Sequence, residues 1–220
     1  MTYRAKFEQE LEDLKLELIK MGDIVISNIN DGLKSFLSMD ITLAEMTIKK
    51  DKMVNDYEKT IEKKCLQIIL KEQPVAKDLR LITSVLKMIT DLERIGDHAA
   101  DISKMTIFMQ KSLKPYVIPH MKLMTEASQK MIKKALDSFV KQDLGLANAV
   151  INDDDEVDAY FEEIKGIVAE AIRHNEIDAD YALYMMMVAK YLERISDHAV
   201  NIGEWVIFSV LGEHNHNVIF

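Results

Sequence analysis

Apolar residues recur every three or four positions along most of the chain. One such run contains Leu11, Leu14, Leu18, Met21 and Val25, and another contains Ile164, Ile167, Val168 and Ala171. This spacing places apolar side chains on one face of an α-helix. The strict alternation of apolar and polar residues that predicts a half-buried β-strand is absent. The pattern therefore predicts an all-α protein.

Short interruptions divide the helical pattern into segments. They fall near Met39-Asp40, near Gln73-Pro74, across residues 114–119, near Gln142-Asp143 and across residues 175–178. Asp40 and Asp143 each precede a restart of the pattern and are expected to cap helices, while Pro74 is expected in the first turn of one. The segments predict six helices of about 22 to 37 residues, and short connections between long helices favour an antiparallel bundle.

Composition agrees with long helices and narrows the setting. The chain has only seven Gly and three Pro in 220 residues, and its 48% apolar content is enough for a buried core. Its one cysteine, Cys65, cannot form an internal disulfide and is expected to be a buried thiol in a reducing compartment. The longest apolar patch, residues 205–211, is too short to span a bilayer. We therefore expect a cytoplasmic protein of one or two domains.

An internal repeat organises the chain. The segment LERIGDHAADI at 92–102 returns as LERISDHAVNI at 192–202, with eight of eleven positions identical. Upstream, Asp40 and Asp51 correspond to Asp143 and Asp154 at a spacing of 103 residues. These matches predict an internal duplication of a three-helix unit, with one copy in residues 1–114 and the other in residues 115–220.

Acidic residues form a stripe in each copy. In the first copy Glu93, Asp97 and Asp101 share one side of a helix, away from its apolar face. In the second copy the stripe consists of Glu193, Asp197 and Asn201, with Glu204 one turn further along. Like charges one turn apart destabilise a helix, so the stripe needs compensation. Pairing with Arg94 and Arg194, exposure to water, or a hard divalent or trivalent cation would each supply it.

The repetition of the same polar residues in both copies argues against a stripe that merely faces water. A solvated face tolerates shuffling of its charges, and core packing explains repeated Leu, Ile and Ala but not a repeated polar set. Four further polar residues, one turn apart in each copy, either lean toward the same sites or favour helix N-termini: Asp51, Asn55, Asp154 and Asp158. His98 and His198 lie between the acids and the core, where they either pair with a carboxylate or bind metal.

Several functional classes are disfavoured by the sequence. With 28 Lys and Arg residues against 37 Asp and Glu residues, the net charge of −9 disfavours binding to nucleic acid. The chain has no glycine-rich phosphate loop and no Gly-x-Ser-x-Gly turn, and Cys65 lies in a helical run. Nucleophilic catalysis is therefore not indicated.

These motifs resemble the PhoU family of phosphate-signalling regulators along the whole chain. The resemblance rests on the segments QPVAKDLR at 73–80, DLERIGD at 91–97, LERISD at 192–197 and NIGE at 201–204. It implies two tandem three-helix bundles with pseudo-twofold symmetry and metal clusters on the bundle surface. The implied ligands are Glu93, Asp97 and Asp101, and Glu193, Asp197 and Asn201, with Asp51, Asn55, Asp154 and Asp158 in second rank and Glu204 as an additional candidate. Ser196 in place of glycine and Asn201 in place of an acid distinguish the second site.

The resemblance also implies a function. Members of the family are negative regulators of phosphate uptake and of the phosphate-starvation response, and they are not known as enzymes. We therefore expect a cytoplasmic homodimer that contacts a phosphate ABC transporter, through its ATPase or membrane subunits, and a sensor histidine kinase. Contact with the membrane is expected only through these partners, and none with nucleic acid. Oxygen ligands suit Fe, Mn, Mg, Ca or Zn.

Two alternatives remain open at this point. A carboxylate-bridged di-metal enzyme or metal store would need Glu-x-x-His motifs that project into a bundle core, whereas the only such spacing is Glu213 to His216 in the tail. A purely structural helical module whose acidic stripes bind no metal is the other.

Overall fold

The computed structural model describes residues 3–111, 116–214 and 217–218, and within them it confirms the all-α fold. Six long helices follow one another along the chain. Their bounds are α1 Tyr3–Ser38, α2 Ile41–Glu72, α3 Ala76–Met109, α4 Pro119–Lys141, α5 Leu144–Arg173 and α6 Ala179–Leu211. Within the described ranges, no helix is both long and apolar enough to cross a membrane.

Two of the predicted features of helix ends are confirmed, and one is wrong. The side chains of Asp40 and Asp143 accept hydrogen bonds from backbone N–H groups three residues later, each at 3.0 Å, as predicted. Pro74 is not in the first turn of α3, because the helix begins at Ala76 with Val75 as its N-cap. The reason is that Gln73 ends α2 in a left-handed conformation with φ 47°, and proline commonly follows such a helix end.

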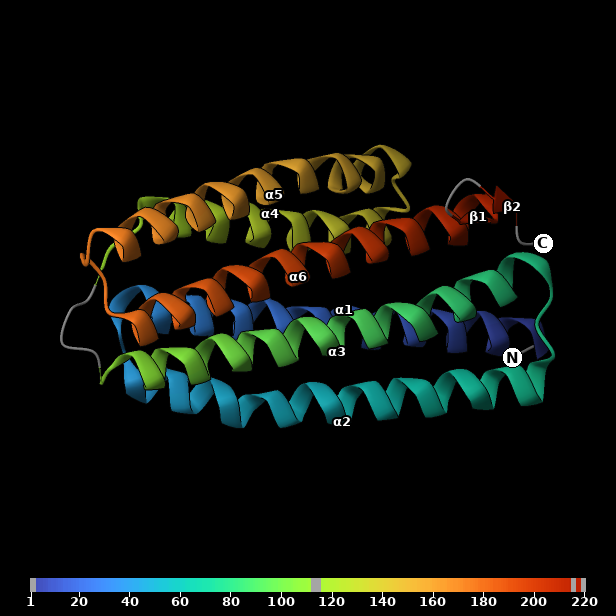
Figure 1. Cartoon of the computed structure of the whole chain (residues 1–220). Helices are drawn as coiled ribbons and strands as arrows, with labels where there is room; N and C mark the ends of the chain where they lie inside the picture. Colours follow the sequence, from blue (N-terminus) through green and yellow to red (C-terminus); the bar gives the residue numbers. More distant parts are fainter. Residues whose placement is uncertain (1–2, 112–115, 215–216, 219–220) are drawn as a thin grey trace.

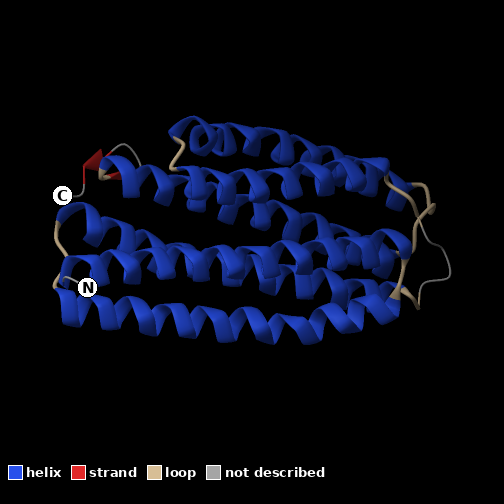
Figure 2. Ribbon diagram, turned by 180° about the vertical axis from the view of Figure 1, so that it is seen from behind, coloured by secondary structure: helices blue, strands red, loops and turns tan. Residues whose placement is uncertain are grey.

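The six helices form two three-helix bundles side by side (Figure 1). Helices α1, α2 and α3 pack on one another, and α4, α5 and α6 do the same. The bundles join where α3 meets α6 and where α1 meets α4, so α2 and α5 occupy opposite edges, as the view from behind also shows (Figure 2). This confirms the predicted pair of three-helix bundles. The predicted boundary at residues 114 and 115 lies outside the described residues.

The duplication extends into the core of the two edge helices. Every buried position of α2 has a buried counterpart in α5 103 residues later. The α2 set is Ala44, Thr47, Val54, Ile61, Cys65 and Ile68, and the α5 set is Ala147, Val150, Val157, Ile164, Val168 and Ala171. Cys65 is fully buried as predicted, and this burial raises the pKa of its thiol to about 12.

A salt bridge between helices also occurs at the same place in both bundles, but with its charges exchanged. In the first bundle Lys50 of α2 lies 2.5 Å from Asp31 of α1. In the second bundle Lys134 of α4 pairs with Asp153 of α5. A shift of 103 residues places Asp31 on Lys134 and Lys50 on Asp153. The position keeps its complementary charges although neither residue is kept.

A small hairpin follows the last helix. The strand β1, Glu213–His214, pairs antiparallel with β2, Asn217–Val218, after Gly212 ends α6 at φ 83°. The sequence pattern did not predict these strands. Two-residue strands are too short to produce a recognisable alternation. His216 lies outside the described residues.

Candidate metal centres

The first candidate centre lies between α2 and α3. Asp51 and Asn55 come from α2, while Glu93, Asp97 and Asp101 come from α3, so the packing brings both ranks of predicted ligands together. Gly96 permits a close approach of the two helices. A Cβ at this position would lie 3.3 Å from Asp51 Oδ1 and 3.2 Å from Val54 Cγ1. The missing side chain at Gly96 leaves room for Asp51 and Val54 to pack closely on α3.

Electrostatics in this centre reflects crowded carboxylates that are partly withdrawn from water. Burial raises the pKa of Asp51, and the negative charge of Asp97 raises it further. Burial and Asp97 raise the pKa of Glu93 in the same way. The Glu93 side chain is only 16% exposed, so the stripe does not simply face water. Such a group of carboxylates favours a nearby positive charge.

Basic side chains supply part of that charge. The Arg94 guanidinium lies 3.2 Å from Asp97 Oδ2 and 3.5 Å from Glu93 Oε2. Lys104 Nζ lies 2.8 Å from Asp101 Oδ1. The predicted pairing of Arg94 with the stripe is therefore present. These pairs are half-exposed, and pairs of this kind contribute about 0–1 kcal/mol each. A multivalent cation would displace them at little cost.

Glu58 is an additional member of the first centre. Burial raises its pKa, and both Arg94 and Asp97 lie close enough to shift it as well. We did not single out this residue from the sequence. Its spacing was nevertheless informative, because positions 51, 55 and 58 fall on one side of α2.

The second candidate centre lies between α5 and α6. It contains Asp154 and Asp158 on α5 and Glu193 and Asp197 on α6. Burial, followed by the charge of Asp158, raises the pKa of Asp154 to about 6. Lys190 Nζ lies 2.5 Å from Glu193. Phe161 stands at the position equivalent to Glu58, so this centre has a phenyl ring where the first has a carboxylate.

Two predicted ligands of the second centre are placed differently. The side-chain amide of Asn201 donates to Asp91 Oδ1 of α3 at 3.1 Å, so the structure gives Asn201 a partner in the opposite bundle. Glu204 lies half-buried one turn further along α6. Their roles as ligands stay predictions.

A polar seam, which we define as Asp91, His98, Tyr191, His198 and Asn201, joins α3 and α6 between the two centres. His198 Nδ1 lies 2.9 Å from Asp91 Oδ1, which fulfils the predicted pairing of this histidine with a carboxylate. His98 instead stacks on Tyr191 with 5.4 Å between ring centroids. Burial, reinforced by His198, lowers the pKa of His98 to about 4. Asp91 was not predicted, although it directly precedes the repeated motif.

The donor chemistry of both centres fits a hard cation. Buried oxygens of Asp51, Asn55 and Asp154 have no hydrogen-bond partner among the described residues, and such acceptors are suited to metal coordination. In the part of the chain that the structure describes, however, no three His, Cys, Asp or Glu side chains already surround one point as a metal site would require. Several of the carboxylates are instead in ion pairs with Arg94, Lys104 and Lys190.

Fold and sites together define a duplicated helical protein with one acidic centre in each bundle. The family model described as PhoU domain matches this chain twice, over residues 18–106 and 121–206. The chain therefore belongs to the PhoU family, as its motifs suggested. The two matches correspond to the two bundles and confirm that the repeat is a repeated domain.

Relatives and solved structures agree along nearly the full length. The chain is 35% identical to the phosphate-specific transport system accessory protein PhoU homolog 1 of Thermotoga maritima, over 97% of this chain and 93% of the relative. The crystal structure of PhoU from Pseudomonas aeruginosa superimposes with a TM-score of 0.90 and 33% identity, over 94% of this chain and 100% of the other. The crystal structure of the phosphate transport system regulatory protein PhoU from Streptococcus pneumoniae superimposes with a TM-score of 0.88 and 25% identity, over 94% of this chain and 98% of the other.

Proposed function

We propose that this protein is a negative regulator of phosphate uptake that acts as a metal-binding helical adaptor. Its relatives are named accessory or regulatory proteins of phosphate transport, which supports a regulatory role in phosphate uptake and not an enzymatic one. The proposed partners are a phosphate ABC transporter and a sensor histidine kinase, and the proposed assembly is a homodimer. Two rigid bundles with acidic centres on α2–α3 and α5–α6 suit a protein that works through its surfaces.

One observation supports the metal-binding part of the proposal above the others. Each centre contains buried carboxylate oxygen that lacks a hydrogen-bond partner among the described residues, Asp51 Oδ1 in the first and Asp154 Oδ1 in the second. A multivalent cation would supply the missing partner and offset both causes of the raised pKa values, which are burial first and then repulsion between the carboxylates. Fe, Mn, Mg, Ca and Zn all accept such oxygen ligands, and the cation would link an edge helix to an inner helix.

Elemental analysis tests the metal sites directly. The protein and a variant with Glu93, Asp97, Glu193 and Asp197 all changed to alanine are purified in parallel and washed mildly. A control variant removes four exposed glutamates that belong to neither centre: Glu8, Glu12, Glu126 and Glu162. We expect metal in the wild type and the control but not in the first variant. Equally low metal content in all three would contradict the proposal and favour a structural module.

Gene deletion tests the regulatory part. We expect a strain that lacks this protein to accumulate more phosphate and to express phosphate-starvation reporters in phosphate-rich medium, with both effects reversed by the wild-type gene. Unchanged accumulation and reporter expression would contradict the proposal. The deletion strain is then complemented with the four-alanine variant or with the control variant, at equal protein level. A difference between the two shows whether regulation requires the acidic centres.

A di-metal enzyme is less well supported by the structure. Such sites lie in a shielded bundle core, whereas these carboxylates lie between helices at the surface, with the Asp97 side chain 35% exposed. Oxygen consumption by the iron-loaded protein is the measurement that would favour this alternative.

A further inference from the structure

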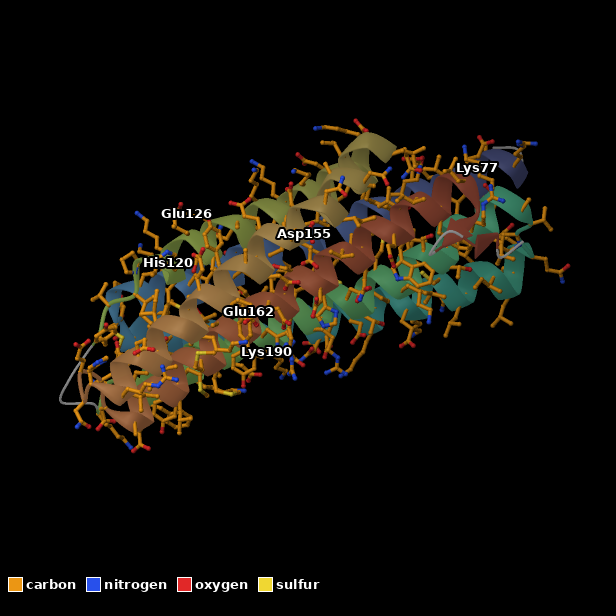
Figure 3. All side chains as sticks on the ribbon, turned by 45° about the horizontal axis from the view of Figure 1, so that its top comes forward. Lys77, His120, Glu126, Asp155, Glu162 and Lys190 are labelled. Atoms are coloured by element: carbon orange, nitrogen blue, oxygen red, sulfur yellow. The ribbon has the colours of Figure 1, made fainter. Side chains whose placement is uncertain are left out.

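A surface cavity of about 490 Å³ lies at one end of the second bundle, apart from both acidic centres. Its floor is apolar and consists of Gly166, Ile167 and Ala171 of α5. Three carboxylates line it as well, from Glu163 and Glu170 of α5 and from Glu176 in the loop after α5. Figure 3 shows His120, which also lines the cavity, near the start of α4. We call this cavity the α5 hollow.

The floor of the α5 hollow has room for a flat or extended group. A Cβ built on Gly166 would meet no described atom within 4 Å, so the backbone of α5 is open here. Ile167 is half-buried and presents aliphatic surface, and Ala171 is buried beneath it. Apolar surface of this kind is stabilised when a hydrocarbon chain covers it.

The carboxylates flank this floor and are only lightly engaged. Glu163 and Glu170 lie two helical turns apart on α5, with side chains 55% and 58% exposed. Glu163 Oε2 lies 3.2 Å from His120 Nε2, and Glu176 Oε2 accepts from the Tyr116 hydroxyl at 3.5 Å. Glu170 pairs with Arg173 on the same exposed turn. Exposed pairs contribute little, so an incoming cation exchanges with them readily.

The first repeat lacks these features at the equivalent positions. A shift of 103 residues matches every buried position of α2 and α5, and it places Thr60 on Glu163 and Gln67 on Glu170. Lys63 and Lys64 take the places of Gly166 and Ile167. The duplicated helices therefore share their core but differ in this surface. The apolar, acid-flanked character of the α5 hollow is therefore not required by the shared core.

We propose that the α5 hollow is a docking site for an arginine side chain of a protein partner. The aliphatic stem of arginine would cover Gly166 and Ile167, and its guanidinium would reach the flanking carboxylates. A guanidinium presents five donors in a planar fork, which suits carboxylates on both sides better than the single ammonium of lysine does. Tyr116 adds an aromatic side chain to the lining, and planar cations bind well against aromatic faces.

Methyl NMR of the full chain tests this proposal. Isoleucine methyl groups are labelled, and the Ile167 resonance is assigned by its loss in Ile167→Val. A blocked pentapeptide with one central arginine is added to about 20 mM in the presence of EDTA, a range that detects weak binding. The same peptide with citrulline has nearly the same shape but no charge. We expect a saturable shift of Ile167 with arginine only.

Two variants and one control make the test specific. Replacement of Glu163, Glu170 and Glu176 by glutamine is expected to weaken binding at least about tenfold, because the charge-assisted hydrogen bonds are lost. Gly166→Lys gives the floor of the hollow the residue that the first repeat has there, Lys63, and is expected to abolish the shift while it keeps the Ile167 methyl group as the reporter. The control replaces Glu12, Glu45 and Glu126, which are exposed elsewhere, and should bind normally.

Several outcomes would overturn the proposal. An absent shift, an equal shift with citrulline, or an equal loss in the control variant would each do so. A shift caused by Mg²⁺ and not by the arginine peptide would instead identify a cation site. A change of oligomeric state in the triple glutamine variant would place a second copy of this chain on the hollow.

Discussion

The two bundles hold their helices together with the same device built in opposite ways. In the first, an acid on α1 meets a base on α2, and in the second a base on α4 meets an acid on α5. The buried positions of α2 and α5 keep their register, and all but Thr47 are apolar. Packing therefore fixes the buried positions tightly. The residues of the surface ion pair are less constrained, because the pair needs only to remain complementary in charge.

The seam between the bundles and the surfaces beyond it diverged further. Asp91 of α3 corresponds to Tyr191 of α6, so one carboxylate serves His198 while a phenol ring stacks on His98. The pair Glu58 and Phe161 differs in the same way between the acidic centres. A duplicated fold with unequal sites allows the two halves to bind different ligands, and the following changes test how unequal they are.

Removal of Asp91 should have the largest effect. Asp91 is 9% exposed and accepts from both Asn201 and His198, so Asp91→Ala leaves two polar groups at a buried contact without their acceptor. We expect a loss of about 2–4 kcal/mol in the free energy of unfolding. Tyr191→Phe, its counterpart, should cost less than about 1 kcal/mol. Urea denaturation measures both, and equal losses would show that the seam is not asymmetric.

Charge reversal in the salt bridge of the second bundle should have the next largest effect on stability. Lys134→Asp places two carboxylates together at a contact where the side chains are only 20% and 26% exposed. We expect about 1–3 kcal/mol of destabilisation, with most of it restored by Asp153→Lys in the same chain. The matching Lys50→Asp should cost less, because Lys50 is 38% exposed. A double variant no more stable than the single one would argue against a direct interaction.

Substitutions at Glu58 and at its counterpart Phe161 should each alter metal affinity by about tenfold, a typical effect for residues around a site. Each variant is made in a chain whose other centre is disabled by alanine substitutions. Glu58→Gln is expected to weaken Mn²⁺ binding to the first centre, and Phe161→Glu to strengthen binding to the second, by isothermal titration calorimetry. No change in either affinity would exclude Glu58 from the site.

The smallest expected effect is that of a substitution at Cys65, whose counterpart in the second bundle is Val168. Cys65→Val is expected to change stability at pH 7 by less than about 1 kcal/mol, because the two side chains are similar in volume. At high pH the free energies of unfolding of the wild type and of Cys65→Val are expected to diverge. The buried thiol keeps its proton to about pH 12, whereas an exposed thiol titrates near 9.0, so the folded state binds more protons above pH 9.

Proton binding determines which of the two proteins is less stable at high pH. Above pH 9 the wild type should lose stability as the pH rises, by at most about 1.4 kcal/mol per pH unit from this group, and Cys65→Val should lack that part of the loss. Thiol reagents should also fail to label the folded protein at pH 8. Rapid labelling would contradict the burial of Cys65.

Much of the fold was predictable because helical spacing and the repeat are local patterns. The caps at Asp40 and Asp143 and the division into two three-helix bundles followed from them. The position of Pro74 did not, because its place depends on how α2 ends at Gln73. The tail hairpin was missed because its strands have two residues each.

The candidate centres were predictable on each helix but not between helices. The stripe through Glu93 and Asp97 followed from spacing alone, whereas its partial burial depends on α2, which packs closely over Gly96. The partner of Asn201 lies in the other bundle, at a contact that no periodicity along the chain encodes. Residue spacing describes one helix face and cannot say which helix will cover it.

The exchanged salt bridges also bear on how the chain avoids misassembly. Because the two repeats share a core register, α1 could in principle pack against α5, and α4 against α2. Such a mispaired bundle would bring Asp31 against Asp153 or Lys50 against Lys134, so like charges would meet. The correct pairings are thus favoured over the exchanged ones within one chain and between neighbouring chains. A reversal of signs that is neutral in the native state becomes a means of folding fidelity.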